Sequence, residues 1–419
     1  MKDSEVRDEK MGVKGGKWIV RSLFTFHFSL LTMFAWAQTD SVAVDTAQVS
    51  LPWPQNIQAR LDTLTQDPMF ESTQLGLLVY DLTADSTLYS YGAKQTLRPA
   101  STMKLLTAIT ALDRLGLNHQ FRTSLYYQGD ISNRTLNGGL YCVGGMDPQF
   151  DEVDMKAFVD CLHRLGVDTI RGHIIGDTSF KEADLLGEGW CWDDDNPQLT
   201  PLLISRKDEF LSRFVEMMRN DSIIVEAPCS GGTLPKDVKG ICSRYHTLEQ
   251  VLVPMMKESD NLYAESVFFQ IAASSGARPA KAVHARQIIK NTLGKAGVHD
   301  VMYRIADGSG LSLYNYVTPE LLVKLLRYAY RNPRIYKGLL PSLPLAGQDG
   351  TLKKRMKESS AYDKVRAKTG TVTGVSALAG YCPAASGHLL AFCIMNQGVM
   401  RSADGRAFQD RVCNALCSE

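Results

Sequence analysis

The feature that most constrains the fold of this chain is a set of three short polar motifs that lie far apart in the sequence. The motifs are Ser-Thr-Met-Lys at 101–104, Ser-Asp-Asn at 259–261 and Lys-Thr-Gly at 368–370, and each pattern occurs once. One such motif alone has little predictive value, but three in this order and in suitable local contexts are improbable by chance. We therefore expect a fold that brings the three motifs to one site.

The local sequence predicts the element that carries each motif. Apolar residues recur at intervals of three and four after the first motif, which predicts a helix over 101–115. A second predicted helix, over 248–256, leads into the Ser-Asp-Asn motif. The third motif lies in a predicted strand. The strands expected at the two ends of the chain form an early hairpin and a late antiparallel meander, over 75–82, 87–91, 364–371, 375–381 and 389–395.

Ser101 and Lys104 are candidates for a nucleophile and its base. A serine hydroxyl is a weak nucleophile at neutral pH and needs a base beside it. Residues three apart on a helix lie on the same face, so the lysine amine can reach the hydroxyl. Burial and the nearby charge of Lys368 would lower the pKa of Lys104 and supply some neutral amine. The alternative for an isolated motif is a solvated polar face of a helix.

The residues Lys368, Thr369, Gly370 and Thr371 are candidates for substrate binding on a strand. A glycine lets the backbone approach a ligand closely, because no side chain intervenes. An extended peptide can lie beside such a strand as an added strand. The lysine and the two threonine hydroxyls are suited to hold a terminal carboxylate. The alternative is a surface strand with a turn glycine.

Together the three motifs are typical of penicillin-binding proteins and class A β-lactamases. The chain resembles more specifically the D-alanyl-D-alanine carboxypeptidase/endopeptidase family, the penicillin-binding protein 4-like, low-molecular-mass class C enzymes. Asp-Gly-Ser-Gly-Leu-Ser at 307–312 and Ala-Gly-Gln-Asp-Gly-Thr-Leu at 346–352 resemble segments of that family, as does Gly-Gly-Met-Asp-Pro at 144–148. The resemblance extends from roughly Gly76 to Gln397.

The resemblance implies a role for each site residue. Ser101 would be acylated with Lys104 as its general base, and Ser259 would relay a proton to the leaving amine. Asn261 would bind the substrate amide and orient Lys104. Backbone N–H groups of Ser101 and Thr371 would form the oxyanion hole. The substrate carboxylate would be bound by Lys368, Thr369 and Thr371. No C-x-x-C or H-E-x-x-H pattern occurs, so a zinc site has no support in the sequence, and no metal or cofactor is expected.

The resemblance also implies an α+β fold in which helices pack on an antiparallel sheet, as in β-lactamases and transpeptidases. The 155 positions from Lys104 to Ser259 exceed what that domain needs. We therefore expect a catalytic domain at 54–117 and 241–419, interrupted by an inserted α/β domain at 118–240. Larger members of the family carry a second inserted domain. Here the chain passes quickly from Asp195 to a helix predicted over 209–218, so the second insertion is expected to be reduced or absent.

The N-terminus has the layout of a secretory signal. Basic residues precede an apolar run at 23–34, and Ala35-Trp36-Ala37 follows with small residues where a signal peptidase cuts. This predicts a signal peptide at 1–37, a polar leader at 38–53 and export to the periplasm. A buried helix or a membrane anchor is the alternative. The near balance of 46 Lys and Arg against 45 Asp and Glu argues against a nucleic-acid partner.

The partners implied by the family are peptidoglycan stem peptides and β-lactam antibiotics, with loose membrane or wall association left open. One alternative is a β-lactamase on the same fold, but the chain has no E-x-x-L-N-type loop to supply its deacylating glutamate. Another is a non-catalytic wall-binding or β-lactam-sensing protein, which would have no need for the nucleophile. The sequence does not separate carboxypeptidase from endopeptidase activity.

Overall fold

The computed structural model describes residues 51–193, 196–299 and 302–419. The predicted signal peptide at 1–37 lies outside the described residues, as does all of the leader at 38–53 except its last three residues. In the part of the chain that the structure describes, no helix combines the length and the apolar character of a membrane span.

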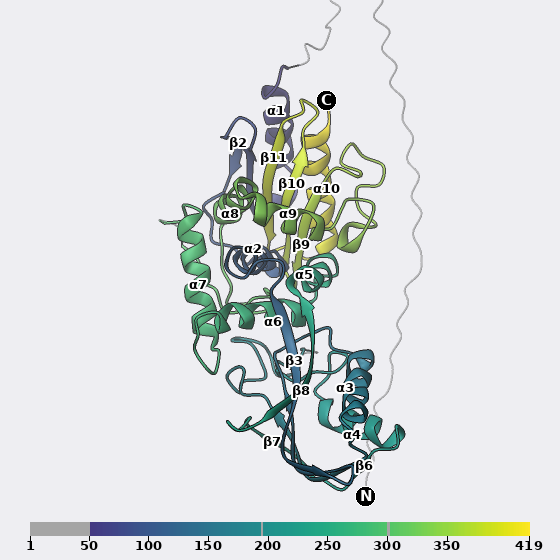
Figure 1. Cartoon of the computed structure of the whole chain (residues 1–419). Coiled ribbons are helices and arrows are strands. Elements are labelled where there is room, and N and C mark those ends of the chain that lie inside the picture. The colour runs from purple at the N-terminus through teal and green to yellow at the C-terminus, as the bar shows by residue number, and fades with distance from the viewer. Residues whose placement is uncertain (1–50, 194–195, 300–301) are drawn as a thin grey trace, which may run out of the picture. The chain divides into compact units, whose positions relative to one another are not determined.

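The first sheet joins the two ends of the described chain. Its five strands run in the order β2-β1-β11-β10-β9, and every neighbouring pair is antiparallel. The predicted hairpin and meander are confirmed, and the pairing of β1 with β11 connects them. Figure 1 shows these strands side by side. The strands are β1 (Gln74–Asp81), β2 (Ser86–Tyr91), β9 (Arg366–Val372), β10 (Val375–Pro383) and β11 (Leu389–Gln397).

Helices cover both faces of this sheet. Because successive side chains of a strand point to opposite faces, Phe392 and Ile394 of β11 pack with one set of helices, while Cys393 and Met395 pack with the other. The first set is α1 (Gln55–Thr65) and α10 (Ser402–Cys417), and the second contains α2 (Lys104–Arg114) and α8 (Pro319–Arg331). Buried on both faces, these central strands are apolar almost throughout.

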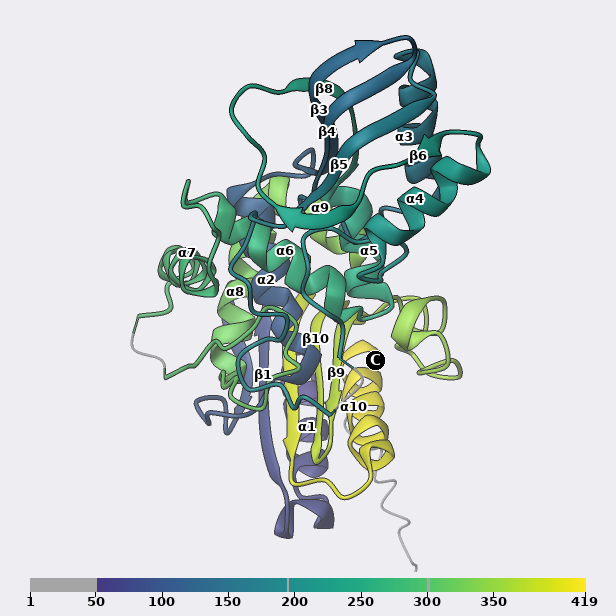
Figure 2. The same cartoon turned by 90° about the horizontal axis from the view of Figure 1, so that it is seen from below.

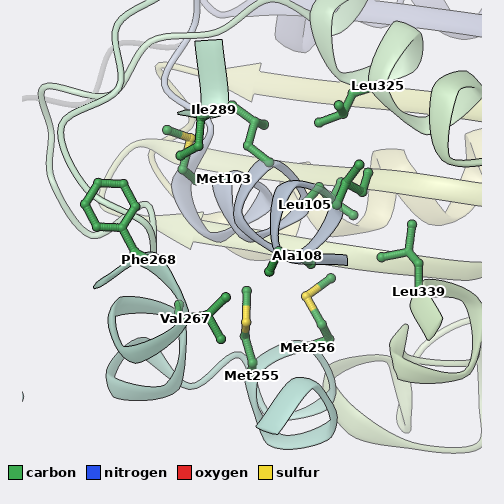
Figure 3. Packing of buried hydrophobic residues seen from close by; sticks show 14 of the residues in the cluster. Met103, Leu105, Ala108, Met255, Met256, Val267, Phe268, Ile289, Leu325 and Leu339 are labelled. Atoms are coloured by element: carbon green, nitrogen blue, oxygen red, sulfur yellow. The ribbon is translucent and has the colours of Figure 1, made fainter. Parts of the chain in front are cut away.

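Helix α2 lies at the centre of the larger apolar cluster. All residues from Lys104 to Leu112 are buried, as expected for a helix that other elements surround. Figure 3 shows Met255, Met256 and Val267 packed along one side of it. The surrounding helices are α8 and α5 (Leu248–Lys257), α6 (Asn261–Ala273), α7 (Ala282–Lys295) and α9 (Pro333–Ser342). This packing fixes the start of α2, where the first motif lies.

The second sheet has the order β6-β5-β4-β3-β8, and β7 also pairs with β5. Its β4, β5 and β6 are parallel and are connected through helices that pack on the sheet, so this part of the chain is α/β, as expected. Figure 2 shows both helices beside this sheet. The elements are β3 (Gln120–Ser132), β4 (Thr135–Val143), α3 (Glu152–Arg164), β5 (Thr169–Asp177), α4 (Phe210–Asn220), β6 (Ile224–Val225), β7 (Cys229–Gly232) and β8 (Lys239–Thr247).

The chain enters and leaves the second sheet through two adjacent strands, since Gln120 of β3 pairs with Thr247 of β8. The expected boundary between residues 240 and 241 therefore falls inside β8. The segment from Lys181 to Trp190, expected in the inserted domain, contacts α6 and the start of α7 instead. Between β5 and α4 the described residues contain no helix or strand. The division into domains, with 118–240 as the insertion, stays a prediction with these adjustments.

Candidate active site

Ser101 lies in a short 3-10 helix, Ala100–Met103, that precedes α2. The sequence predicts one continuous helix over 101–115, and the structure differs at its first turn. Side chains three apart are aligned in a 3-10 helix, so Ser101 and Lys104 face each other directly. The Lys104 Nζ atom lies 2.8 Å from Ser101 Oγ.

The Lys104 amine is completely buried and has three hydrogen-bond partners. Two are carbonyl oxygens, Asn261 Oδ1 at 2.7 Å and Ser309 O at 2.8 Å, and these can only accept. A neutral amine has two N–H groups and one lone pair, so its lone pair is left to face the Ser101 hydroxyl. Burial lowers the pKa of Lys104 to about 8, which makes the neutral form accessible near neutral pH.

Ser259 and Asn261 flank the start of α6. Asp260 caps this helix by accepting a hydrogen bond from the Tyr263 N–H group at 3.2 Å. Ser259 has a φ of 64°, a left-handed conformation that is unfavourable for a residue with a side chain. Such strained residues cluster at functional sites. The cap and the strained turn hold the two side chains toward the two buried lysines.

Lys368 of β9 is the second fully buried lysine of the site. Its Nζ donates to Ser259 Oγ at 2.7 Å and to the Thr369 carbonyl oxygen at 2.8 Å. Burial, and after it the charge of Lys104, lowers the pKa of Lys368 well below its usual range. Among the ion pairs of the described residues, none involves Lys368.

Gly370 brings β9 against the turn that carries the nucleophile. A Cβ atom at this position would lie 2.6 Å from the Pro99 carbonyl oxygen and 3.2 Å from the Ser101 nitrogen. The glycine was expected to let the strand approach a ligand closely, but in the structure it lets β9 pack on the 3-10 helix. Thr369 donates from Oγ1 to Thr351 Oγ1 at 2.8 Å, and Thr371 is exposed.

Two buried carboxyl groups, which the sequence analysis did not single out as site residues, support the loop beside Lys104. Asp307 accepts four hydrogen bonds, from the backbone N–H groups of Gly310 and Ser312 and from the side chains of Asn315 and Trp190, at 2.7–2.8 Å. Glu265 accepts hydrogen bonds from the backbone N–H groups of Gly308 and Ser309. Burial raises the pKa of Glu265 to about 8. Glu265 is the only charged residue in the run 262–272, and this was the signal available in the sequence.

A polar cleft of about 620 Å³ adjoins the second motif. One wall contains Ser259 and Asn261, and the other comes from the segment that precedes α4. Arg206 of that segment forms an ion pair with Asp260, and its guanidinium group lies 5.8 Å from the centre of the Tyr263 ring. The cleft therefore lies between the second motif and the segment that joins β5 to α4.

A serine, a buried lysine beside it and a second lysine on an edge strand of an antiparallel sheet define the site of a serine acyl-transfer protein. The chain belongs to the D-Ala-D-Ala carboxypeptidase 3 (S13) family, whose model matches residues 57–204 and 237–417. The family resemblance and the α+β fold class expected from the sequence are confirmed.

Curated relatives and solved structures agree with this assignment. The chain is 27% identical to the D-alanyl-D-alanine carboxypeptidase of Actinomadura sp. strain R39, over 94% of this chain and 89% of the relative. It is 25% identical to the D-alanyl-D-alanine carboxypeptidase DacB of Haemophilus influenzae, over 82% of this chain and 89% of the relative. The crystal structure of penicillin-binding protein 4 (dacB) from Haemophilus influenzae has the same fold, with a TM-score of 0.77, 23% identity and coverage of 85% of this chain and 98% of that one.

Proposed function

We propose that this protein is a serine D-Ala-D-Ala carboxypeptidase that acts on peptidoglycan stem peptides through an acyl-enzyme. The observation that carries the proposal is the contact of the buried Lys104 amine with Ser101 Oγ, because both other partners of that amine are acceptors. A base held in this way is aimed at the one hydroxyl it must deprotonate. The names of the relatives support the same substrate class.

In the proposed acylation step, Ser101 Oγ attacks the carbonyl carbon of the penultimate D-alanine while its proton passes to Lys104. The C–N bond then breaks, and a proton relayed through Ser259 neutralises the departing amine of the terminal D-alanine. Water releases the acyl group in a second step, with the same proton transfers in reverse. Lys368 supports the relay, since it already donates to Ser259 Oγ. The backbone N–H groups of Ser101 and Thr371 are the proposed oxyanion hole.

Lys368 is also the proposed anchor for the substrate carboxylate. A buried lysine with a lowered pKa and no acidic partner among the described ion pairs gains stability when a carboxylate binds beside it. The hydroxyl groups of Thr369 and Thr371 are the proposed additional donors, and Gly370 keeps the strand next to Ser101. This arrangement would recognise a peptide by its free C-terminus.

A β-lactam would react by the same attack on its ring amide. The ring nitrogen stays tethered to the acyl group after the bond breaks, so the adduct is expected to persist. Since stem peptides lie outside the cytoplasmic membrane, the proposal requires export, and we place the protein in the periplasm. Loose association with the wall or membrane is part of this proposal and can be tested by cell fractionation at low and high salt.

The test is a time course with a fluorescent penicillin, followed by intact mass, on the chain without residues 1–37 and on its Ser101→Ala variant. We expect a long-lived adduct that requires Ser101. Rapid turnover of the penicillin would instead indicate a β-lactamase. A folded protein with neither adduct nor turnover would indicate a non-catalytic binding protein. Digestion of purified cross-linked and uncross-linked muropeptides would then separate endopeptidase from carboxypeptidase activity.

A further inference from the structure

Glu265 is a buried acidic residue for which the proposed reaction has no direct role. It lies on α6 four residues after Asn261, so the two side chains project from the same face of the helix. Only 1% of Glu265 is exposed. No ion pair among the described residues includes it, so its burial is not explained by a cationic partner. The burial of a carboxyl group without a cationic partner costs free energy unless hydrogen bonds compensate. The hydrogen bonds of Glu265 therefore indicate its role.

The partners of Glu265 are the backbone N–H groups of one short loop. Its Oε1 accepts from Gly308 at 3.0 Å and from Ser309 at 2.8 Å, and its Oε2 lies 3.2 Å from the same Gly308 nitrogen. The carbonyl oxygen of Ser309 in turn accepts from Lys104 Nζ at 2.8 Å. A single residue, Ser309, therefore connects the Glu265 carboxyl group to the amine proposed as the base: its N–H group donates to Glu265 and its carbonyl oxygen accepts from Lys104.

Helix α6 thus controls both carbonyl partners of the Lys104 amine. It supplies Asn261 Oδ1 directly and fixes Ser309 O through Glu265. The loop has little freedom to compensate for a loss of this contact. A Cβ atom on Gly308 would meet Phe268 at 2.6 Å, and one on Gly310 would meet the Ala100 carbonyl oxygen at 1.9 Å.

We propose that Glu265 is a positioning residue for acylation, which holds the Ser309 carbonyl against the Lys104 amine and so aims the lone pair of that amine at the Ser101 hydroxyl. The proposal rests on the acyl-enzyme function above. The Ser309 carbonyl oxygen accepts from one N–H group of the neutral Lys104 amine, and this hydrogen bond fixes the rotation of the amine about its Cε–Nζ bond. A displacement of about 1 Å in such an arrangement can cost about 100-fold in rate.

The charge of Glu265 gives a second readout. Ionised Glu265 raises the pKa of Lys104, as do Asp307 and Asp260, against the dominant lowering by burial. Two other lysines interact with this pair. Burial lowers the pKa of Lys181, and Glu265 is one of the carboxyl groups that counteract this effect. Burial and the charge of Lys104 lower the pKa of Lys368. Because burial raises the pKa of Glu265 itself to about 8, this charge is largely present only above about pH 7. Removal of the charge alone therefore moves the upper part of the acid limb of the acylation rate to lower pH and leaves the rates below about pH 7 unchanged.

The experiment compares Glu265→Ala, Glu265→Gln and Glu265→Asp in the chain without residues 1–37. Acylation by a chromogenic β-lactam is measured under single-turnover conditions, so that the binding constant and the maximal acylation rate are separated. We expect the Ala and Asp variants to lose about 10- to 100-fold in the maximal rate with little change in binding. The Gln variant keeps an oxygen at the Oε1 position, so it should stay within about threefold of the wild type at its optimum, with its acid limb at lower pH.

A merely structural role gives a different result. In that case the Ala variant would lose thermal stability but acylate at the wild-type rate per folded molecule, and the proposal would be wrong. If the Ala variant does not fold, wild-type rates in Asp together with an unshifted pH profile in Gln would overturn it equally. If the wild type itself forms no Ser101 adduct, the proposed function fails first, which separates the two outcomes.

Discussion

Two fully buried lysines, Lys104 and Lys368, lie close enough for the charge of Lys104 to lower the pKa of Lys368, in addition to the larger effect of burial. Each amine contacts a different serine: Lys104 lies 2.8 Å from Ser101 Oγ and Lys368 lies 2.7 Å from Ser259 Oγ. Two like charges buried in one site disfavour each other. The arrangement favours the neutral form of a lysine in the free enzyme, which the proposed base Lys104 requires. It also favours the binding of an anion beside Lys368.

Removal of the proposed base should abolish most of the acylation without loss of the fold. Lys104→Met has a similar length and suits the apolar surroundings of α2. General base catalysis typically contributes about 10²- to 10⁴-fold, so we expect a loss of that size in the rate of adduct formation with penicillin. Lys290→Met, at an exposed position of α7, is the matched control and should react like the wild type. Wild-type acylation by Lys104→Met would remove the lysine from the mechanism.

The pH dependence of kcat/KM should report the ionisation of Lys104 in the free enzyme. Because burial lowers its pKa from 10.5 to about 8, and only the neutral amine accepts a proton, activity should rise with pH along an acid limb with a midpoint near 8. The measurement is the release of D-alanine from a peptide substrate across pH 6–9.5. A rate that still rises without levelling off at pH 9.5, or one that is flat across this range, would contradict the assignment.

Gly370→Ala should displace β9 from the turn that carries Ser101. Its added Cβ atom would lie 2.6 Å from the backbone oxygen of Pro99, a contact that requires the backbone to move. We expect a loss of about 1–3 kcal/mol of stability and at least about a tenfold loss in acylation rate. Gly294→Ala in α7 is the control: nothing lies within 4 Å of its Cβ position, and alanine there should stabilise by about 0.5–1 kcal/mol. Equal behaviour of the two variants would show that the strand has room to adjust.

Asp307→Asn should destabilise the loop beside Lys104. Each Asp307 oxygen accepts two hydrogen bonds, and in asparagine the amide nitrogen would face two donors in place of one oxygen. We expect a loss of about 2–4 kcal/mol in the free energy of unfolding, measured by urea denaturation. Asp130→Asn, on an exposed position of β3, should change stability little. An unchanged unfolding free energy for Asp307→Asn would mean that the loop does not depend on these four bonds.

Elements with a regular local pattern could be predicted from the sequence. The hairpin of β1 and β2 and the meander of β9, β10 and β11 follow from alternating or continuous apolar runs between turn residues. Helix α6 was not predicted, because it is buried all round and has no polar face to mark its period. The pairing of β8 with β3 was missed for a different reason: it joins residues more than 100 positions apart, and no local signal specifies such a partner.

The same distinction applies to the site. The residues of the three motifs were predicted by type and spacing, and the structure brings Ser101, Lys104 and Asn261 into one hydrogen-bonded group. Their roles remain proposals. Two other contacts of the site could not be predicted: that of Gly370 with the turn at 99–101, and that of Glu265 with the loop at 308–309. Each joins segments that are far apart in the sequence. Such contacts are determined by tertiary packing, and no periodic pattern in the sequence indicates them.

The most direct test of the central claim is the release of D-alanine from a synthetic peptide that ends in D-Ala-D-Ala, measured side by side for the wild type, Ser101→Ala and Lys104→Met. We expect one equivalent of D-alanine per peptide from the wild type and release near background from both variants, with unchanged thermal unfolding. Release by Ser101→Ala at the wild-type rate, or no release by a folded wild type that does form a penicillin adduct, would contradict it.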